Sequence, residues 1–224
     1  MTIGVEMKVV VLCGGKGLRM DSDIPKCLIE VKGKPILWWI CSHFKKYGFN
    51  DFIFCLGNKG EMIKEYFEKT DFKIQFVDTG DRNKGDRLGF ISTYLKDEEN
   101  FFVTYADDLC NVDLNALLAF HKSHKGWCTL TAIKQQSEFG VLELDGNKIK
   151  KFIEKPLINN WINGGYYIMR KEILDMCNHL DLETDILTAL TFSENIYAFY
   201  HTGQWFPINT TKDVNTANEK FLEG

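Results

Sequence analysis

Three glycines, an arginine and a lysine near the start of the chain have the types and spacing of a phosphate-binding site. The apolar run Val9–Leu12 leads into the glycine-rich stretch Gly14–Arg19, and Pro25–Lys26 follows shortly after. Residues without a Cβ let backbone N–H groups approach an anion closely, while Arg19 and Lys26 supply the charge that neutralises a polyphosphate. We therefore predict that this loop binds phosphate groups.

Two common glycine motifs do not account for the loop. A Walker loop needs a lysine followed by Ser or Thr directly after its last glycine, and a dinucleotide fingerprint needs Gly-x-Gly-x-x-Gly at the start of a helix. Neither is present in Gly14–Arg19. The remaining alternative for the loop alone is a glycine-rich turn beside an ordinary surface lysine. The ordered sequence Pro25–Lys26 and Gly33–Lys34–Pro35 behind it disfavours that alternative.

Strands and helices alternate along the first half of the chain. The pattern predicts strands at residues 8–13, 51–56, 73–77 and 100–105, and helices at residues 36–47, 59–68 and 87–94. Such alternation is typical of the α/β class, with a single doubly wound, mostly parallel, Rossmann-like sheet. Ligands of these sheets bind at the carboxyl ends of the strands, where the glycine loop and the segment Tyr105–Asp108 both fall.

The second half follows a different pattern. It predicts a helix at residues 113–124, strands at residues 128–133, 140–144, 148–153 and 164–169, and a hairpin turn at Asp145–Gly146. This pattern indicates a mixed or antiparallel extension of the sheet. No linker rich in Pro, Gly or Ser separates the halves, so we expect residues 1–224 to form a single domain.

Composition favours a soluble enzyme and disfavours several classes of partner. The net charge of −4 gives no overall attraction to nucleic acid or to an anionic membrane. Neither a membrane-length apolar stretch nor a signal peptide is found, which predicts a cytoplasmic protein. The seven cysteines are scattered without a Cys-x-x-Cys pair, which argues against a disulfide framework and a zinc site.

The N-terminal loop closely resembles the signature of the sugar nucleotidyltransferases. In that family Gly-Gly-x-Gly-x-Arg follows the first strand, and Pro-Lys and Lys-Pro come next; here the same order reads Gly14–Arg19, Pro25–Lys26 and Lys34–Pro35. The resemblance implies a fold of the nucleotidyltransferase type. It also implies that Arg19 holds the β- and γ-phosphates of a nucleoside triphosphate and that Lys26 lies near the α-phosphate.

Two segments of the second half resemble the acceptor side of the family. Phe152–Pro156 is similar to its Glu-Lys-Pro motif, and Trp161–Tyr167 is similar to its Asn-x-Gly loop. The resemblance implies that Lys155 holds the phosphate of the acceptor. It divides the domain into a nucleotide-binding half, about residues 7–110, and an acceptor-binding half, about residues 111–224. The implied acceptor site consists of Gly140, Glu154, Lys155, Asn163, Gly164 and Trp205.

Among the subfamilies, the chain most resembles the glucose-1-phosphate cytidylyltransferases. The similar segments are Leu12–Arg19, Lys34–Ile40, Ile63–Phe67, Val77–Gly80, Leu142–Asn147 and Gln204–Pro207. This resemblance implies that the substrate is CTP. UTP, dTTP or GTP with a sugar 1-phosphate is an alternative, and so is a nucleotide-binding sensor without catalysis. The implied nucleotide site consists of Leu12, Cys13, Gly14, Gly15, Lys16, Gly17, Thr79, Gly80, Gly85, Asp86, Arg87 and Tyr105.

The implied reaction is attack of an acceptor phosphate oxygen on the α-phosphorus of CTP, in line with the departing pyrophosphate. Because the nucleophile is already ionised near neutral pH, positioning and charge neutralisation do most of the catalysis, and no general base is needed. The catalytic residues implied for this step are Arg19, Lys26 and Lys155.

The metal ligands depart from the family pattern. Mg²⁺ is the expected cofactor, and Asp107 matches its first carboxylate ligand in the family. The second carboxylate normally lies in a Trp-x-Pro-x-Asp-Thr stretch, and here that position is Asn209. An amide oxygen can still coordinate Mg²⁺, but it removes one negative charge. We expect Asp108, which replaces a glycine of the family, to restore that charge.

A second departure concerns the acceptor and the assembly. The glucose-specific enzymes carry an insertion after the element that resembles Glu65–Phe67, whereas this chain continues directly through Lys69–Lys73. Another sugar 1-phosphate is therefore a candidate acceptor, as is a non-sugar such as phosphoglutamine, which a related cytidylyltransferase uses in capsule phosphoramidate synthesis. Trp38–Trp39 on an amphipathic helix indicate packing onto the sheet or contact with a partner, so a homodimer is also a candidate.

Overall fold

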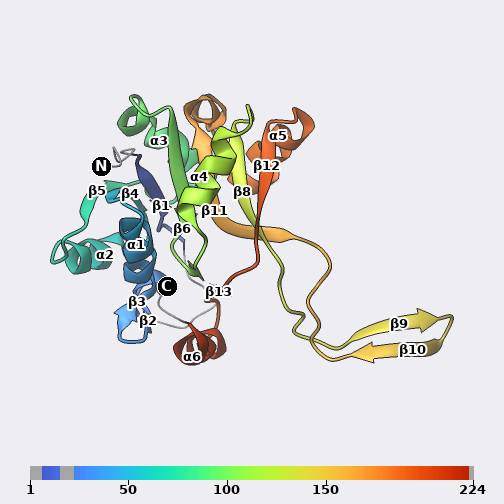
Figure 1. Ribbon diagram of the computed structural model, residues 1–224. Helices are drawn as coiled ribbons and strands as arrows, with labels where there is room; N and C mark the ends of the chain where they lie inside the picture. The colour runs from blue at the N-terminus through green and yellow to red at the C-terminus, as the bar shows by residue number, and fades with distance from the viewer. Residues whose placement is uncertain (1–6, 16–22, 222–224) are drawn as a thin grey trace.

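A seven-stranded sheet forms the centre of the molecule (Figure 1), seen in a computed structural model that describes residues 7–15 and 23–221. Its strand order is β12-β8-β11-β6-β1-β4-β5. Four neighbouring strands are parallel, namely β6 (Asn100–Tyr105), β1 (Val9–Leu12), β4 (Asp51–Leu56) and β5 (Lys73–Asp78). This confirms the mostly parallel sheet predicted for the first half.

The other three strands form the predicted mixed extension. Strand β11 (Ile162–Arg170) runs antiparallel to both of its neighbours, β6 and β8 (Cys128–Ile133). The edge strand β12 (Ile196–His201) is parallel to β8. One reversed strand therefore joins the parallel half of the sheet to its extension.

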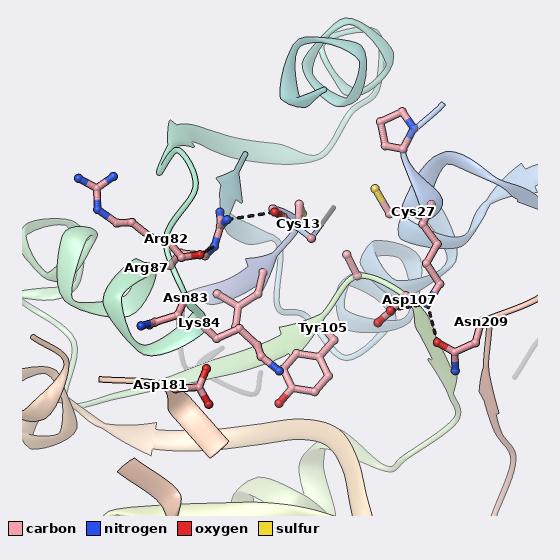
Figure 2. A pocket seen from close by; sticks show the side chains of 16 residues that line it. Cys13, Cys27, Arg82, Asn83, Lys84, Arg87, Tyr105, Asp107, Asp181 and Asn209 are labelled. Carbon is pink, nitrogen blue, oxygen red and sulfur yellow. Dashed lines mark hydrogen bonds and ion pairs between the residues drawn. The ribbon is translucent and has the colours of Figure 1, made fainter. Parts of the chain in front are cut away.

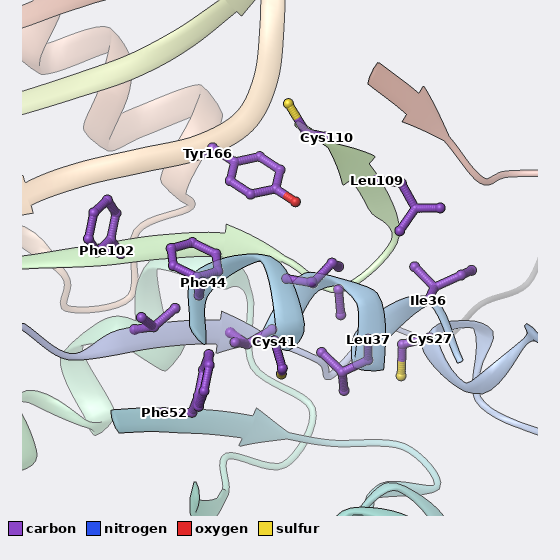
Figure 3. Close-up of a cluster of buried hydrophobic side chains, with 14 of the residues drawn as sticks. Cys27, Ile36, Leu37, Cys41, Phe44, Phe52, Phe102, Leu109, Cys110 and Tyr166 are labelled. Carbon is purple, nitrogen blue, oxygen red and sulfur yellow. The ribbon is translucent and has the colours of Figure 1, made fainter. Parts of the chain in front are cut away.

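Helices cover both faces of the sheet because buried residues alternate along each strand. Val9 and Val11 of β1 face the core beneath α1, shown in Figure 3, whereas Val10 faces the opposite core. One layer contains α1 (Ile36–Lys46), α2 (Gly60–Phe67), α4 (Leu114–Lys122) and α6 (Thr211–Lys220). The other contains α3 (Lys84–Phe90) and α5 (Thr188–Phe192), together with a π-helical turn at Leu182–Leu187.

Short elements complete the fold. They are the two-stranded pairs β2 (Glu30–Val31) with β3 (Lys34–Pro35) and β7 (Asp108–Cys110) with β13 (Trp205–Pro207), and 3-10 turns at Lys26–Leu28, Ser92–Leu95 and Lys171–Met176. The pairing of β7 with β13 brings the two expected metal-binding segments together from positions about one hundred residues apart in the sequence.

A long hairpin arm, residues 134–161, leaves the sheet between β8 and β11 (Figure 1). It contains β9 (Val141–Asp145) and β10 (Lys148–Ile153), which pair in antiparallel fashion. The predicted turn is shifted by one residue: Asp145 pairs with Lys148, so the turn residues are Gly146 and Asn147. Gly146 has a φ of 56°, in the left-handed region that favours glycine.

One predicted helix differs clearly from the structure. The helix expected at residues 87–94 begins at Lys84 and ends at Phe90, and a 3-10 turn follows. Its start is set by Asn83, whose side-chain oxygen accepts a hydrogen bond from the Asp86 N–H at 2.8 Å. Gly85 and Asp86 therefore belong to a helix rather than to a phosphate loop.

Cysteines and tryptophans pack within the chain. All seven cysteines are buried and free. The Trp39 indole donates a hydrogen bond to the Val31 carbonyl at 2.7 Å and packs against Phe221, while Trp38 packs against Phe72. The two tryptophans therefore serve the fold of their own chain.

Among the residues described, no helix is both long enough and apolar enough to cross a membrane.

Candidate active site

A cavity of about 490 Å³ opens at the carboxyl ends of β1 and β6 (Figure 2). Its size lies within the roughly 300–1,000 Å³ of typical ligand sites. The walls come from the loop after β1, the start of α3, the segment after β6 and the segment after β13. This is the edge of the sheet at which ligands of doubly wound folds bind.

Lys26 joins the two expected metal ligands. Its Nζ donates to Asp107 Oδ2 at 2.7 Å and to Asn209 Oδ1 at 2.9 Å, and the Lys26 side chain is largely buried. One carboxylate oxygen, one amide oxygen and one cation therefore meet at a single point on the cavity wall. A site of this composition can hold an oxygen-coordinated divalent cation and neutralise a phosphate at the same time.

Local structure holds Asp107 and Asn209 in place. The Ile208 N–H donates to the Asp107 carbonyl at 3.1 Å, next to the β7–β13 pair. The Asn209 N–H donates to Asp213 Oδ2 at 2.9 Å, which ties Asn209 to the start of α6. There, Thr210 and Asp213 form a capping box that anchors the helix. The backbone of each expected metal ligand is thus fixed independently of its side chain.

Arg87 holds the glycine loop to the sheet. Its buried guanidinium donates to the carbonyls of Gly14, Leu56 and Gly80 at 2.9–3.0 Å and to the Thr79 hydroxyl. These acceptors lie at the ends of β1, β4 and β5, so one side chain ties three strand ends together. A Cβ on Gly14 would lie 1.8 Å from the guanidinium, which explains the glycine there. Arg87 therefore positions the loop, and burial lowers its pKa.

A chain of hydrogen bonds extends from the cavity toward β11. The Tyr105 hydroxyl donates to Glu183 Oε1 at 2.5 Å and lies 2.7 Å from the Tyr167 hydroxyl. Glu183 also accepts from Lys84, whose ammonium lies 4.7 Å from the centre of the Tyr105 ring. Asn163 donates to the Tyr167 hydroxyl and completes the chain. Burial is the main cause that raises the pKa of Tyr105, so this residue stays protonated.

Asp108 lies beside the cavity wall rather than on it. A Cβ added to Gly165 would lie 2.8 Å from Asp108 Oδ2 and 3.0 Å from the Tyr105 ring, so the Asp108 carboxylate lies close to this glycine. The Asp108 carbonyl accepts a hydrogen bond from the Tyr166 hydroxyl at 3.0 Å. Burial, and then the neighbouring Asp107 carboxylate, raise the pKa of Asp108 to about 8. The expectation that Asp108 supplies the missing metal charge stays a prediction.

The structure brings six of the twelve predicted nucleotide residues into one cavity, together with Lys26, Asp107 and Asn209. Its lining includes Leu12, Cys13, Gly14, Gly15, Lys26, Arg87, Tyr105, Asp107 and Asn209. Lys16, Gly17 and Arg19 lie outside the described residues. Thr79 and Gly80 lie behind the wall as hydrogen-bond acceptors of Arg87.

Gly85 and Asp86 lie away from the cavity. A Cβ on Gly85 would be 2.2 Å from the Leu180 carbonyl oxygen, so this glycine permits close packing of α3. The Asp86 carboxylate accepts from the His179 N–H at 3.1 Å. In this structure Gly85 therefore allows close packing, and Asp86 holds the backbone of His179.

The predicted acceptor residues divide into two groups. Asn163 belongs to the Tyr105 network, and the Trp205 indole donates to the Gly164 carbonyl at 3.1 Å, so Trp205 of β13 contacts the β11 segment that carries Asn163 and Gly164. Gly140, Glu154 and Lys155 lie on the arm and are not part of the cavity wall. The Lys155 side chain is half-exposed, and its Nζ lies 4.0 Å from Glu154 Oε1.

Several cavity residues escaped the sequence analysis. Arg82, Asn83 and Lys84 line the cavity, and Asp181 faces it from the other side (Figure 2). The two basic residues between Gly80 and Gly85 were the feature of the sequence that could have indicated Arg82, Asn83 and Lys84 as cavity residues. Asp181 caps the π-helical turn by accepting from the N–H groups of Glu183 and Thr184, and this leaves the Glu183 side chain directed at Lys84 and Tyr105.

Comparison with known proteins agrees with this geometry. The profile of the family described as Nucleotidyl transferase matches residues 8–224. The glucose-1-phosphate cytidylyltransferase of Salmonella typhi is 33% identical, over 97% of this chain and 95% of its own length. The probable glucose-1-phosphate cytidylyltransferase of Bacillus subtilis (strain 168) is 34% identical, over 97% of each chain. The Dictyostelium discoideum mannose-1-phosphate guanylyltransferase catalytic subunit beta is 30% identical, over 92% of this chain and 62% of its own.

Solved structures show the same fold. HddC from Yersinia pseudotuberculosis superimposes with a TM-score of 0.75 and 23% identity, covering 96% of this chain and all of its own, and one of its crystal structures contains GMP-PN. A putative glucose-1-phosphate thymidylyltransferase from Bacillus anthracis has a TM-score of 0.74 and 18% identity, over 95% of this chain and 94% of its own. The family match over nearly the whole sequence shows that the chain belongs to the nucleotidyl transferase family.

Proposed function

We propose that the protein is a cytidylyltransferase, which transfers CMP from CTP to a phosphorylated small molecule and releases pyrophosphate. The observation that carries the proposal is the convergence of Lys26, Asp107 and Asn209 on the wall of the strand-end cavity. Support for CTP comes from two relatives, each at least 33% identical over 97% of the chain, whose names specify a cytidylyltransferase.

The residues of the cavity would act by position and charge. Lys26 offers a cation to the phosphate at which substitution occurs, and the Gly14–Gly15 backbone, held by Arg87, offers an open surface to the triphosphate. The attacking phosphate oxygen is already anionic near pH 7, so no side chain has to remove a proton from it. Charge neutralisation in the cavity then provides the main stabilisation of the transition state.

The donor atoms fit Mg²⁺. The Asp107 and Asn209 oxygens lie within hydrogen-bond distance of one Lys26 ammonium, and Mg²⁺ prefers oxygen ligands. Among the described residues no group of three or more His, Cys, Asp or Glu side chains could hold a metal ion by itself. Asp107 and Asn209 would therefore share the ion with phosphate oxygens and water. When bound, Mg²⁺ would neutralise charge that develops on the triphosphate.

The acceptor is a sugar 1-phosphate or a non-sugar phosphate such as phosphoglutamine. The Salmonella typhi relative aligns over 249 positions, more than the 224 residues of this chain, so the relative has segments that this chain lacks. This difference favours an acceptor other than glucose 1-phosphate. A role in capsule or surface polysaccharide synthesis would follow from such a product.

A pyrophosphate-release assay tests the proposed function. CTP, UTP, dTTP and GTP are each mixed with Mg²⁺, the protein and one of a panel of sugar 1-phosphates and other phosphorylated metabolites, including phosphoglutamine. We expect turnover with CTP and one acceptor class, and slow turnover with glucose 1-phosphate. Faster turnover with another triphosphate would contradict the base assignment. Binding of CTP without pyrophosphate release for any acceptor would favour a sensor.

A further inference from the structure

The Lys26 ammonium holds the two oxygens that a metal ion would need. Its Nζ lies 2.7 Å from Asp107 Oδ2 and 2.9 Å from Asn209 Oδ1 (Figure 2). Mg²⁺ needs its oxygen ligands at about 2.0–2.1 Å. Two cations at one pair of oxygens repel each other strongly, because they are only a few ångströms apart. The ammonium and a divalent ion therefore compete for Asp107 and Asn209.

Of these three groups, the ammonium is the one that can move farthest while the fold stays intact. Asp107 and Asn209 carry short side chains on backbones that are fixed next to the β7–β13 pair and at the start of α6. Lys26 begins a 3-10 turn in which the Leu28 N–H donates to the Pro25 carbonyl at 2.9 Å. Its ammonium ends a flexible four-carbon stem. It can therefore leave the two oxygens while the turn keeps its place.

The charges at this point favour the lysine over a free metal ion. The Asp107 carboxylate and the Lys26 ammonium neutralise each other, and the Asn209 amide adds no charge. The Lys26 side chain is only 17% exposed, so solvent screens this ion pair less than a surface pair. Among the described residues, Asp107 and Asn209 supply the side-chain oxygens at the ammonium, whereas the Asp108 carboxylate lies beside Gly165. Because metal affinity rises with the charge of the ligands, a single neutralised carboxylate attracts a free divalent ion weakly.

A nucleoside triphosphate would reverse this balance. Lys26 lines the same cavity as the Gly14–Gly15 backbone, so phosphates bound there lie within reach of its side chain. Phosphate oxygens carry more negative charge than one carboxylate and one amide, and lysine binds them as a point charge. Once the ammonium donates to the phosphates, the Asp107 and Asn209 oxygens become available to an ion that the phosphates also attract. Uptake of the metal ion then depends on the nucleotide.

We propose that Lys26 keeps divalent metal ions away from Asp107 and Asn209 until a nucleoside triphosphate draws its ammonium to the phosphates. The role of the triphosphate rests on the proposed function, whereas the competition between the ammonium and the ion does not. The nucleotide-free protein then has little affinity for the ion, and Asn209, where a second carboxylate would bind the ion without a nucleotide, is part of this control.

The first experiment measures Mn²⁺ binding to the full chain without nucleotide, from the EPR signal of the free ion. Asn209→Asp supplies a second carboxylate and should bind Mn²⁺ more tightly than the wild type. Adding Lys26→Met, which keeps the stem and removes the charge, should tighten binding by at least about tenfold more. The exposed Lys212 on α6 is the matched control, and Lys212→Met in the Asn209→Asp background should change the affinity less than twofold.

Equal Mn²⁺ affinity of Asn209→Asp with and without Lys26→Met would overturn the proposal. So would Mn²⁺ binding to the nucleotide-free wild type that is as tight as binding to Asn209→Asp. These titrations use neither a nucleotide nor an acceptor, so they test the competition even if the proposed function fails.

The second experiment tests the role of the triphosphate. Water-proton relaxation is enhanced when Mn²⁺ is bound to a protein, which distinguishes this ion from Mn²⁺ bound to free nucleotide. In the wild type, the enhancement should appear only after CTP, or a non-hydrolysable analogue of it, is added. The Asn209→Asp variant with Lys26→Met should show enhancement before the addition. Full enhancement in the wild type before any nucleotide is added, or none after addition of CTP, UTP, dTTP or GTP, would contradict the proposal.

Discussion

The cavity wall around Arg87 and the arm differ in how much of each the rest of the chain covers. Every hydrogen-bonding group of the Arg87 guanidinium meets an acceptor of its own chain, and the side chain is 3% exposed. On the arm no residue is buried. The cavity wall is thus fixed by the fold of one chain, whereas Glu154 and Lys155 lie on a segment that the same chain leaves uncovered. Four substitutions or conditions test this difference.

Lys26→Ala should have the largest effect. Its ammonium contacts both Asp107 and Asn209, and loss of a charge that acts on the transition state costs about 10²- to 10³-fold in kcat. Steady-state pyrophosphate release measures the change. The exposed Lys96, which follows the 3-10 turn after α3 and does not line the cavity, is the matched control, and Lys96→Ala should keep wild-type rates. Equal rates for both variants would show that the cavity is not the reaction site.

Arg87→Lys should destabilise the body of the protein. Lysine cannot reproduce the planar fork, so the Gly14 and Gly80 carbonyls lose the donor that Arg87 provides, while the Leu56 carbonyl keeps the Thr79 N–H. We expect the free energy of unfolding to fall by roughly 2–4 kcal/mol, measured by urea denaturation. The exposed Arg82 provides the control, and Arg82→Lys should cost less than about 1 kcal/mol. A loss below 1 kcal/mol for Arg87→Lys would mean that the loop does not depend on this residue.

Acid should destabilise the body through His121. This side chain is buried between Thr129 and Asn100, and burial, with the nearby His124, lowers its pKa from 6.5 to about 4. The unfolded chain therefore binds a proton below pH 6.5 that the folded chain does not accept until about pH 4. Stability is full above pH 6.5 and falls as the pH drops toward 4, by about 3 kcal/mol for this residue.

The His121 contribution is isolated by comparing unfolding free energies at pH 7 and pH 4.5. His121→Gln should be less stable than the wild type at pH 7 but should lose less stability on acidification. An identical pH dependence in the two proteins would assign the acid sensitivity to other groups.

Glu183→Gln should have the smallest effect and should act on one substrate. The carboxylate accepts from Lys84 and Tyr105, on the side of the cavity that faces β11. Loss of its charge weakens this network by about 1 kcal/mol, which corresponds to roughly fivefold in kcat/KM for the acceptor. KM for CTP should stay unchanged. A rise in KM for CTP alone would place Glu183 on the nucleotide side; the exposed Glu219→Gln is the control.

Sequence reasoning predicted the parts of the fold that local patterns determine. Strands 51–56, 100–105, 128–133 and 148–153 have the predicted bounds because apolar runs or alternation with flanking breakers define them. The start of α3 was missed because Asn83 caps it, and an asparagine in a polar run has no distinctive pattern. The contact of Glu183 with Tyr105 could not be predicted from the sequence because only the fold brings these two residues together. The position of Lys155 on an uncovered arm follows from tertiary structure, which the Glu-Lys-Pro motif does not encode.

The central claim is that the strand-end cavity binds the triphosphate so that another phosphate can displace its end. A crystal structure with Mg²⁺ and a non-hydrolysable CTP analogue tests this claim most directly. The account predicts density for the phosphates between the Gly14–Gly15 backbone and Lys26, with a metal ion at Asp107 and Asn209. Nucleotide bound at another position, with this cavity empty, would contradict the account.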